Sequence, residues 1–314
     1  MSDEATPPTL TGPTRAQTST QRAVLNTIKG SAGNLVEWYD VYVYTVFATY
    51  FEAQFFDKND ANSTLYIYAI FAVTFVMRPV GSWFFGRYAD RRGRKAALML
   101  SITVMSSCSF LVAIMPTREI IGYWAAVILI LARLVQGFAT GGEYGTSATY
   151  MSEAATAHRR GFLSSFQYVT LVGGHVLAQF TLLIALSVLD VEALSAWGWR
   201  IGFFIGGIAA LVVLWIRRSM DESLSESHLK DIREGKDRDA GSMKALFTTH
   251  WRSLLLVFLI TAGGTVAFYT YSVNAPAIVK STFGTDRAMT ATWINLLGLI
   301  FLLLLQPVGG IISD

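Results

Sequence analysis

Residues 78 to 95 read RPVGSWFFGRYADRRGRK, an apolar run that passes after Gly86 into a short basic loop. One acidic residue, Asp90, stands there among five cations, which are Arg87, Arg91, Arg92, Arg94 and Lys95. Lys and Arg collect in the cytoplasmic loops of membrane proteins, directly beside the membrane-spanning helices. The stretch therefore predicts the cytoplasmic end of one membrane span and the start of the next.

The composition of the whole chain also predicts a membrane protein. Of its 314 residues, 53% are hydrophobic and 15% are charged, whereas an ordinary soluble domain has roughly 25% charged residues. A helix of about 20 apolar residues crosses the bilayer, because lipid offers backbone amides no other partners. Eight stretches fit, at 24–56, 61–86, 96–117, 120–147, 161–189, 201–216, 253–279 and 288–312. We predict an all-α, polytopic protein with eight spans.

Lys and Arg are distributed unevenly over the connecting segments. The amino-terminal tail and the segments after the second, fourth and sixth spans are basic, and the alternate loops hold few cations. Because the basic side of a polytopic protein is cytoplasmic, we predict a cytoplasmic amino terminus in a cell (inner) membrane. Each basic cluster adjoins a span, so we expect no nucleic-acid partner. We expect the protein to be a monomer.

The segments divide into four predicted parts: a flexible tail at 1–23, a six-helix bundle at 24–217, a cytoplasmic linker at 218–250 and two further spans at 251–314. The linker is dense in charges of both signs, which fits a solvated connector or a short surface helix. Gly86-x-x-x-Asp90 returns as Gly310-x-x-x-Asp314 after the eighth span. Since some transporters consist of two six-helix halves, we expect four further spans, without which the chain would not transport.

The sequence offers no catalytic or metal-binding signature. Its one cysteine, Cys108, lies in the middle of a span, so neither a disulfide framework nor a thiolate metal site is expected. Zinc-ligand spacing, a nucleophile elbow and a phosphate-binding loop are also missing from the sequence. We therefore expect no enzymatic activity, no metal and no cofactor.

The first span carries a polar stripe within an apolar helix. Glu37, Asp40 and Tyr44 fall at positions i, i+3 and i+7, and Asn34 lies one turn earlier. We expect this stripe to face a water-filled cavity. Arg133 lies near the middle of the fourth span, where a cation costs roughly 2.5 to 3.5 kcal/mol by insertion scales and is seldom left unpaired. Asp40 is its predicted partner.

The predicted pair suggests a proton carrier. A carboxylate beside a cation stays ionised, and the same carboxylate takes a proton more readily in a closed, desolvated cavity. Asp40, Glu37 and Arg133 are therefore the predicted proton-coupling residues. The alternative is a static buried pair that fixes helix packing.

Two motifs resemble those of the major facilitator superfamily. The loop pattern G-x-x-x-D-[RK]-x-G-R-[RK] is matched at Gly86, Asp90, Arg91, Gly93, Arg94 and Lys95. The fourth-span pattern is matched at Arg133, Gly137 and Gly141. The stretches GNLVEWYD, GGEYGTSATYMSE, SFQYVTL and AWGWRI are similar to the metabolite:proton symporter branch of this superfamily. Two positions depart from the branch, which usually has Pro at Gly202 and commonly Gly at Ser82.

The resemblance implies two bundles that rock about a site in the middle of the membrane. It also implies that the loop latches the cytoplasmic face, and the predicted gating residues are Gly86, Asp90, Arg91, Arg94, Glu143, Glu153 and Arg160. Four charged residues, Glu143, Glu153, Arg159 and Arg160, are expected to pair with this loop; ordinary interfacial charges are the alternative for all four. Gly81 and Gly86 are expected to let helices approach closely.

The implied cargo is a small organic acid, α-ketoglutarate, carried together with protons. Arg78, placed towards the cytoplasmic part of its span, and Arg133 are the first candidates to bind its carboxylates, because the guanidinium fork suits them bidentately. Arg200 follows, unless Arg78 and Arg200 simply mark span ends. The other predicted substrate-binding residues are Tyr44, Gln167, Tyr269, Tyr271 and Asn274.

Several alternatives stay open at this level. Gln167 could instead join helices by hydrogen bonds, and His175 fits a packed hydrogen-bond donor better than a proton carrier. Pro276 could kink its helix as a gate hinge. The solute could also be shikimate, citrate, an aromatic acid, proline or betaine, and the protein could be a transporter-like sensor.

Overall fold

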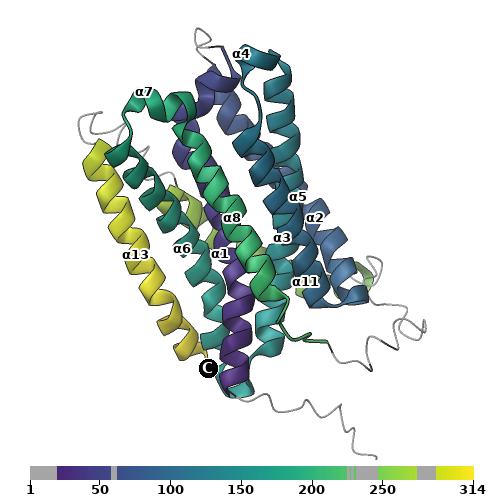
Figure 1. The fold of residues 1–314 in the computed structure, drawn as a ribbon. Helices are drawn as coiled ribbons and strands as arrows, with labels where there is room; N and C mark the ends of the chain where they lie inside the picture. The colour runs from purple at the N-terminus through teal and green to yellow at the C-terminus, as the bar shows by residue number, and fades with distance from the viewer. Residues whose placement is uncertain (1–19, 58–61, 225–226, 228–229, 231–246, 274–287) are drawn as a thin grey trace, which may run out of the picture.

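The computed structural model describes residues 20–57, 62–224, 227, 230, 247–273 and 288–314. The regular elements in these ranges are helices, and most of the long ones run side by side (Figure 1). The long helices are α1 (Thr20–Phe55), α2 (Ser63–Arg92), α3 (Arg94–Ile114), α5 (Trp124–Ala154), α6 (Arg160–Val188), α8 (Trp199–Arg217), α11 (Trp251–Phe268) and α13 (Ala288–Ser313). The short ones are α4 (Arg118–Ile121), η1 (Ala157–Arg159), α7 (Val191–Ala193), η2 (Leu194–Gly198) and η3 (Tyr269–Val273).

Seven helical segments in the described ranges are long and apolar enough to cross a membrane. The helix α3 shows the fit, since its 21 residues rise about 31 Å, close to the thickness of the hydrocarbon core. The predicted span at 24–56, which is not among these seven, corresponds to α1, whose sequence carries charged residues of both signs. This helix packs against α2, α5, α6 and α8, so polar side chains on it can face protein rather than lipid. The predicted all-α, polytopic fold is confirmed.

An aromatic cluster holds the C-terminal part of α1 against the start of α8. Phe47, Phe51 and Phe55 of α1 are each at most 1% exposed. They pack against Trp199 and Phe203 of α8 in one continuous core. In a membrane such packing stabilises mainly through van der Waals contact, because lipid is as apolar as the side chains.

Helices α2 and α5 cross at backbone contact, because small residues line their interface. A Cβ atom on Gly137 would overlap the carbonyl oxygen of Thr74, and one on Gly141 would overlap that of Arg78. A Cβ on Gly81 would likewise overlap the carbonyl oxygen of Phe138. The same expectation is wrong for Gly86, since no atom lies within 4 Å of a Cβ built there. Glycines at the interface thus fix the position of α2 beside α5.

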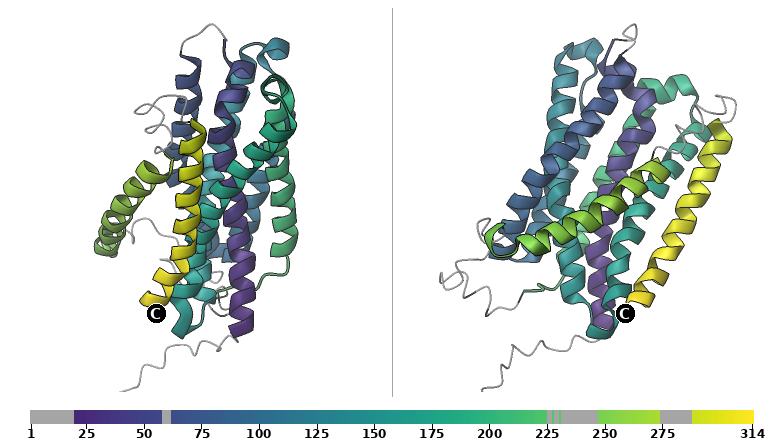
Figure 2. Two further views of the ribbon diagram at one scale, coloured as in Figure 1. Left: turned by 90° about the vertical axis from the view of Figure 1, so that its left-hand side faces the viewer. Right: turned by 180° about the vertical axis from the view of Figure 1, so that it is seen from behind.

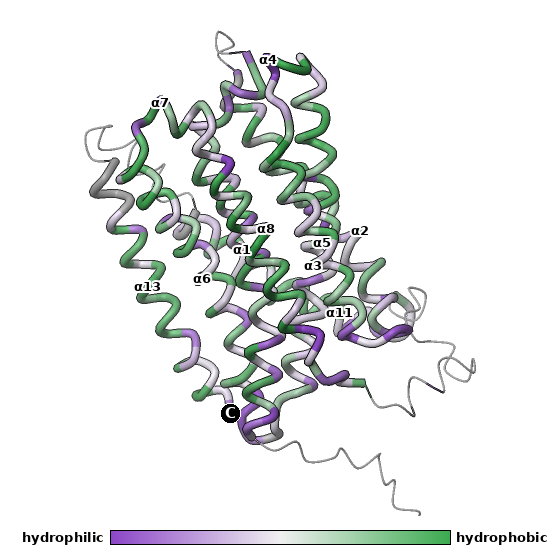
Figure 3. Tube along the Cα trace, viewed as in Figure 1, coloured by the Kyte–Doolittle hydropathy of each residue, from purple (hydrophilic) through white to green (hydrophobic). Residues whose placement is uncertain are grey.

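The helices α11 and α13 extend the bundle on one side. The helix α13 runs along α6, so the C-terminal residue lies beside α6, while α11 crosses the bundle obliquely (Figure 2). Side chains of α11 such as Leu256 and Phe258 are exposed, and hydrophobic residues cover much of α8 and α13 (Figure 3). Exposed apolar faces of this kind suit contact with lipid.

The loop between α2 and α3 turns at Gly93, whose φ of 103° lies in a region that side chains disfavour. Glu222, from the segment after α8, accepts hydrogen bonds there from the backbone N–H groups of Arg94 and Lys95 at 2.9 and 3.1 Å. A carboxylate at a helix N-terminus satisfies amide groups that lack a partner within the helix. The first residues of the predicted linker are therefore fixed to the bundle.

Candidate functional site

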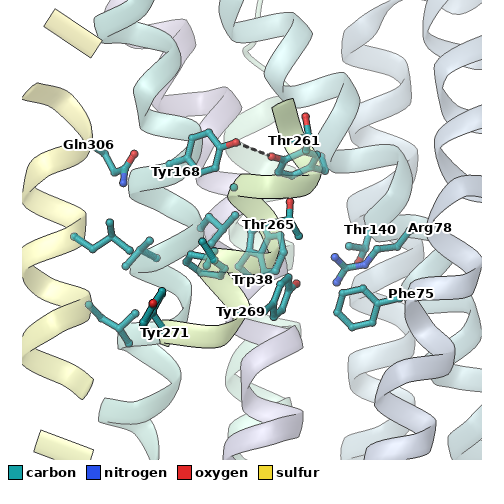
Figure 4. A pocket seen from close by; sticks show the side chains of 18 of the residues that line it. Trp38, Phe75, Arg78, Thr140, Tyr168, Thr261, Thr265, Tyr269, Tyr271 and Gln306 are labelled. Carbon is teal, nitrogen blue, oxygen red and sulfur yellow. Dashed lines mark hydrogen bonds between the residues drawn. The ribbon is translucent and has the colours of Figure 1, made fainter. Parts of the chain in front are cut away.

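A cavity of about 990 Å³ lies between α1, α2, α5 and α6 on one side and α11, η3 and α13 on the other. Its wall is largely apolar and aromatic (Figure 4). The polar side chains that line it include Arg78, Thr140, Tyr144, Tyr168, Tyr269, Tyr271, Asn295 and Gln306. A volume of this size with few polar groups is typical of a small-molecule site.

Arg78 is the only cation among the described residues that line this cavity. Its guanidinium carbon lies 4.1 Å from the ring centroid of Phe75 and 5.1 Å from that of Trp38. No carboxylate in the described ranges lies within 4.0 Å of it, and its Nε atom is buried without a hydrogen bond. Arg78 lies near the middle of α2, and its expected position towards the cytoplasmic part of the span stays a prediction. The aromatic rings orient a guanidinium that keeps its hydrogen-bonding edge available.

Asp40 and Arg133 lie together in the interior of the helices. Arg133 Nη1 is 3.6 Å from Asp40 Oδ2, and the two residues are 1% and 2% exposed. Gln136 bridges them, since it accepts a hydrogen bond from Arg133 at 2.8 Å and donates one to Asp40 at 2.7 Å. Ser109 donates to the other Asp40 oxygen at 2.5 Å. Both carboxylate oxygens are therefore satisfied by neighbours on α3 and α5.

The polar stripe of α1 does not face the cavity, contrary to the expectation from its spacing. Asn34 donates to the Gln167 carbonyl oxygen of α6 at 2.8 Å, and Tyr44 donates to the Ile67 carbonyl oxygen of α2 at 3.1 Å. Asp40 is turned towards α3 and α5, as described above. Asn34, Asp40 and Tyr44 of the stripe thus find their partners on neighbouring helices. Trp38, the neighbour of Glu37 in the sequence of α1, lines the cavity instead.

Glu37 differs from the rest of the stripe. Its side chain is fully buried, and neither carboxylate oxygen makes a hydrogen bond that meets geometric criteria with a described residue. The side chain lies near Thr140 and Arg78, which both line the cavity, and near the charged groups of Glu143 and Arg217. A buried carboxyl group without partners is rare in proteins, and such groups often have a functional role.

The predicted gating residues fall into two separate networks. Glu143 is 2% exposed and forms an ion pair with Arg217, so the expectation that it pairs with the loop after α2 is wrong. At the end of the bundle, Arg94 contacts Asp90 at 2.6 Å and Glu153 at 3.5 Å. Glu143 lies about three helix turns before Glu153 on α5, so it does not reach this second network, and burial favours its contact with the fully buried Arg217.

The remaining predicted gating residues do not join either network in the described ranges. Arg91 and Arg160 are exposed, and Gly86 makes no close helix contact. Asp314, the last residue of the echoed loop motif, accepts hydrogen bonds from the N–H groups of Gly161 and Phe162 at 2.5 and 3.0 Å. This contact joins the end of α13 to the start of α6.

Four predicted substrate-binding residues lie away from the cavity, and the first is Arg133, whose contacts with Asp40 and Gln136 are described above. Gln167 joins helices by hydrogen bonds, which was the alternative interpretation of this residue. Its side-chain amide donates a hydrogen bond to Asn34 and accepts one from Ser147. Arg200 donates to the carbonyl oxygens of Ala113 and Met115, both at 2.8 Å, and so ties the start of α8 to the end of α3. The fourth, Tyr44, packs its ring 4.2 Å from the Arg133 guanidinium.

Other predicted residues line the cavity or lie outside the described ranges. Tyr269 and Tyr271 line the cavity from η3. Asn274 and Pro276 lie outside the described residues, so the predicted hinge stays a prediction. His175 is stacked on Tyr42, with ring centroids 3.9 Å apart and an interplanar angle of 8°.

Sequence reasoning missed several residues of the site. Gln136 lies three residues after Arg133, a spacing that places both on one helix face and that could have revealed it. Ser109 gave no such signal, because its contact with Asp40 joins two separate helices. Trp38 and Thr140 line the cavity, but an aromatic and a hydroxyl residue within apolar spans fit a packed interior equally well.

Comparison with known proteins places this geometry in a family. The family model of the sugar (and other) transporters matches residues 25–253. The chain belongs to this transporter family. Relatives include the α-ketoglutarate permease of Escherichia coli, 42% identical over 94% of this chain and 67% of the permease. Others are a proline/betaine transporter of Salmonella typhimurium, 30% identical over 90% of this chain, and a citrate-proton symporter of Klebsiella pneumoniae, 30% identical over 97%.

The solved structures support the same fold. A proton:xylose symporter of the major facilitator superfamily superposes with a TM-score of 0.73 over 92% of this chain and 69% of the symporter, at 19% identity. The chain spans 67% of the length of the permease and 58% of the proline/betaine transporter. The protein is a multi-pass membrane protein of a family of transporters rather than of enzymes.

Proposed function

We propose that the protein is a secondary active transporter that carries α-ketoglutarate into the cell together with protons. The observation that carries the proposal is Arg78, a cation without an ion-pair partner among the described residues, on the wall of a largely apolar cavity. A guanidinium in such a place suits a carboxylate, which it can bind through two parallel hydrogen bonds. The name of the permease, which is 42% identical, supports the same cargo.

Movement of the cargo would follow alternating access about the cavity. The cavity lies between α1, α2, α5 and α6 on one side and the later helices on the other, as expected where two bundles rock about a central site. Tyr269 and Tyr271, which line the cavity from η3, would contact the cargo from the second bundle. We further propose a cell (inner) membrane location, a cytoplasmic amino terminus and a monomeric state.

The pair of Asp40 and Arg133 is the proposed proton-coupling element. Protonation of Asp40 would remove its attraction for Arg133 and leave the hydrogen bonds of Gln136 to rearrange. Because the pair links α1 to α5, its state can bias the packing of these helices. At the end of the bundle, the contacts of Arg94 with Asp90 and Glu153 are the proposed gating element.

A zwitterion such as betaine is a second candidate cargo. Aromatic rings of Trp38, Tyr144 and Tyr269 line the cavity around Arg78, and such rings attract quaternary ammonium groups. Arg78 would then hold the carboxylate and the rings the ammonium. The names of relatives that carry proline and betaine support this alternative.

Uptake into membrane vesicles tests the proposal. Vesicles that contain the full-length protein, with the four further spans expected from the sequence, should accumulate labelled α-ketoglutarate above its outside concentration when the outside is acidic, and only equilibrate without a pH gradient. The variant Arg78→Gln should abolish uptake, and Asp40→Asn should abolish accumulation while sparing exchange. Accumulation of betaine instead of α-ketoglutarate would show that betaine is the cargo. Full accumulation of α-ketoglutarate by Asp40→Asn would reject the proton-coupling assignment.

A further inference from the structure

The buried charges of the first six helices form an unusually balanced set. In the described ranges the interior holds Arg133, Arg217, Glu37, Asp40 and Glu143 as buried charged residues, with the half-buried Arg78 beside them. Arg133 forms an ion pair with Asp40. Arg217 forms one with Glu143. Glu37 and Arg78 are left over, one of each sign, and no ion-pair contact within 4.0 Å joins them.

The environment of Glu37 makes its charge depend on Arg78. The groups that face it are Arg78 from α2, Thr140, Glu143 and Tyr144 from α5, Arg217 from α8 and Tyr269 from η3. The charge of Arg217 is already balanced by Glu143, whose carboxylate oxygens both accept hydrogen bonds from Arg217. Both tyrosines are neutral near pH 7. The positive charge that remains to balance an ionised Glu37 is therefore that of Arg78.

Arg78 lines the cavity and also lies near Glu37. Its guanidinium contacts the rings of Phe75 and Trp38 on the cavity wall. A carboxylate that enters the cavity and binds Arg78 would add a second negative charge to a region that holds one free cation. In an interior of low dielectric, an uncompensated charge is unfavourable, and an acidic group responds by taking a proton.

We infer that Glu37 takes up one proton when an anion binds at Arg78. The proton comes from bulk water and adds to a Glu37 carboxylate oxygen, which neutralises that group while the bound carboxylate replaces it as the counter-charge of Arg78. This inference rests on the proposed carboxylate site and deepens it. Glu37 thereby links the charge of the cargo to proton uptake, separately from Asp40, whose oxygens are occupied by Ser109 and Gln136.

The test measures protons and ligand together on the purified full chain. α-Ketoglutarate is added to the protein in weakly buffered detergent solution, and the pH change is followed with an indicator dye while binding is measured by calorimetry. The variant is Glu37→Gln, which keeps the shape of the side chain and removes its titration. The matched control is Glu52→Gln on the same helix, where one carboxylate oxygen is also buried without a hydrogen bond.

The unmodified protein and Glu52→Gln should take up about one proton more per bound α-ketoglutarate than Glu37→Gln does. Their affinity should fall by up to about tenfold per pH unit as the pH rises, because the proton becomes scarcer. Glu37→Gln should bind with a flatter pH dependence and more tightly at high pH, since Arg78 then has no competing carboxylate.

Two results would overturn the inference and leave the proposed function intact. One is α-ketoglutarate binding by the unmodified protein without proton uptake. The other is that Glu37→Gln takes up as many protons per bound α-ketoglutarate as the unmodified protein while Asp40→Asn takes up one fewer, which would assign the proton to Asp40. Failure of the unmodified protein to bind any organic acid would instead reject the carboxylate site itself, and the inference with it.

Discussion

Replacing Arg217 with Met should destabilise the protein strongly, and removing its partner as well should restore part of the loss. Arg217 is fully buried and donates hydrogen bonds to the Glu143 carboxylate and, at 2.9 Å each, to the carbonyl oxygens of Gly30 and Leu98. It thus ties α8 to α1, α3 and α5. In Arg217→Met the Glu143 carboxylate would keep only its hydrogen bond from Ser101.

The size of the effect follows from what stays buried. Breaking a buried ion pair by removing one partner costs about 3 to 5 kcal/mol, because an uncompensated charge is left behind. The double variant Arg217→Met/Glu143→Gln leaves no charge, only unsatisfied carbonyl groups, for which a cost of about 1 to 3 kcal/mol is expected. The double variant should therefore be more stable than the single variant.

Thermal unfolding of the purified protein in detergent measures this order. The matched control is Arg218→Met, which changes the same residue type at the next, exposed position and should shift the midpoint little. A double-mutant cycle over positions 143 and 217 gives the coupling between the two residues. Equal midpoints for Arg217→Met and Arg218→Met, or a double variant below the single one, would refute the reasoning.

Three further changes test other parts of the structure. Gly141→Val should push α2 away from α5, because a Cβ there overlaps the Arg78 carbonyl oxygen. Since overpacking costs about 1 to 3 kcal/mol, α-ketoglutarate binding by this variant should weaken tenfold or more. The control variant Gly145→Val, whose side chain enters open space, should bind normally. Asp314→Asn should loosen the end of α13 from α6, because the N-terminus of a helix prefers a carboxylate. A reporter cysteine introduced by Ser165→Cys should then react faster with maleimide. An unchanged reaction rate would argue against the contact. A hydrogen bond from Asn26 and the charge of Arg22 lower the pKa of Asp221. The ionised Asp221 therefore stabilises the folded protein at any pH above the pKa that this carboxyl group has in the unfolded chain. This contribution is lost as the pH falls through the lower pKa of the folded state. Asp221→Asn should accordingly lower the unfolding midpoint at pH 7 and match the unmodified protein at the lowest pH, and a constant difference between them would contradict this.

Part of the site could be predicted from the sequence because burial of charge follows simple rules. Arg133 in the middle of an apolar span required a carboxylate, and the nearest one at a similar depth was Asp40. The two residues are in fact in contact. The same rule gave the wrong partner for Glu143, because Arg217 lies at the end of α8, where a cation fits interfacial placement equally well. Depth along a span is readable from sequence, but the direction in which a helix is turned is not.

The sequence by itself determined the membrane class, the long helices and the two motifs of the transporter family, since these depend on local hydropathy and on short spacings along one chain. Tertiary structure alone decided which polar residues line the cavity. It turned the stripe of α1 into the protein interior and brought Trp38 and Arg78 to the cavity wall. The physical reason is that a helix position acquires its environment only when its neighbours are packed. Close glycine contacts between α2 and α5 set that packing, and they depend on residues far apart in the chain.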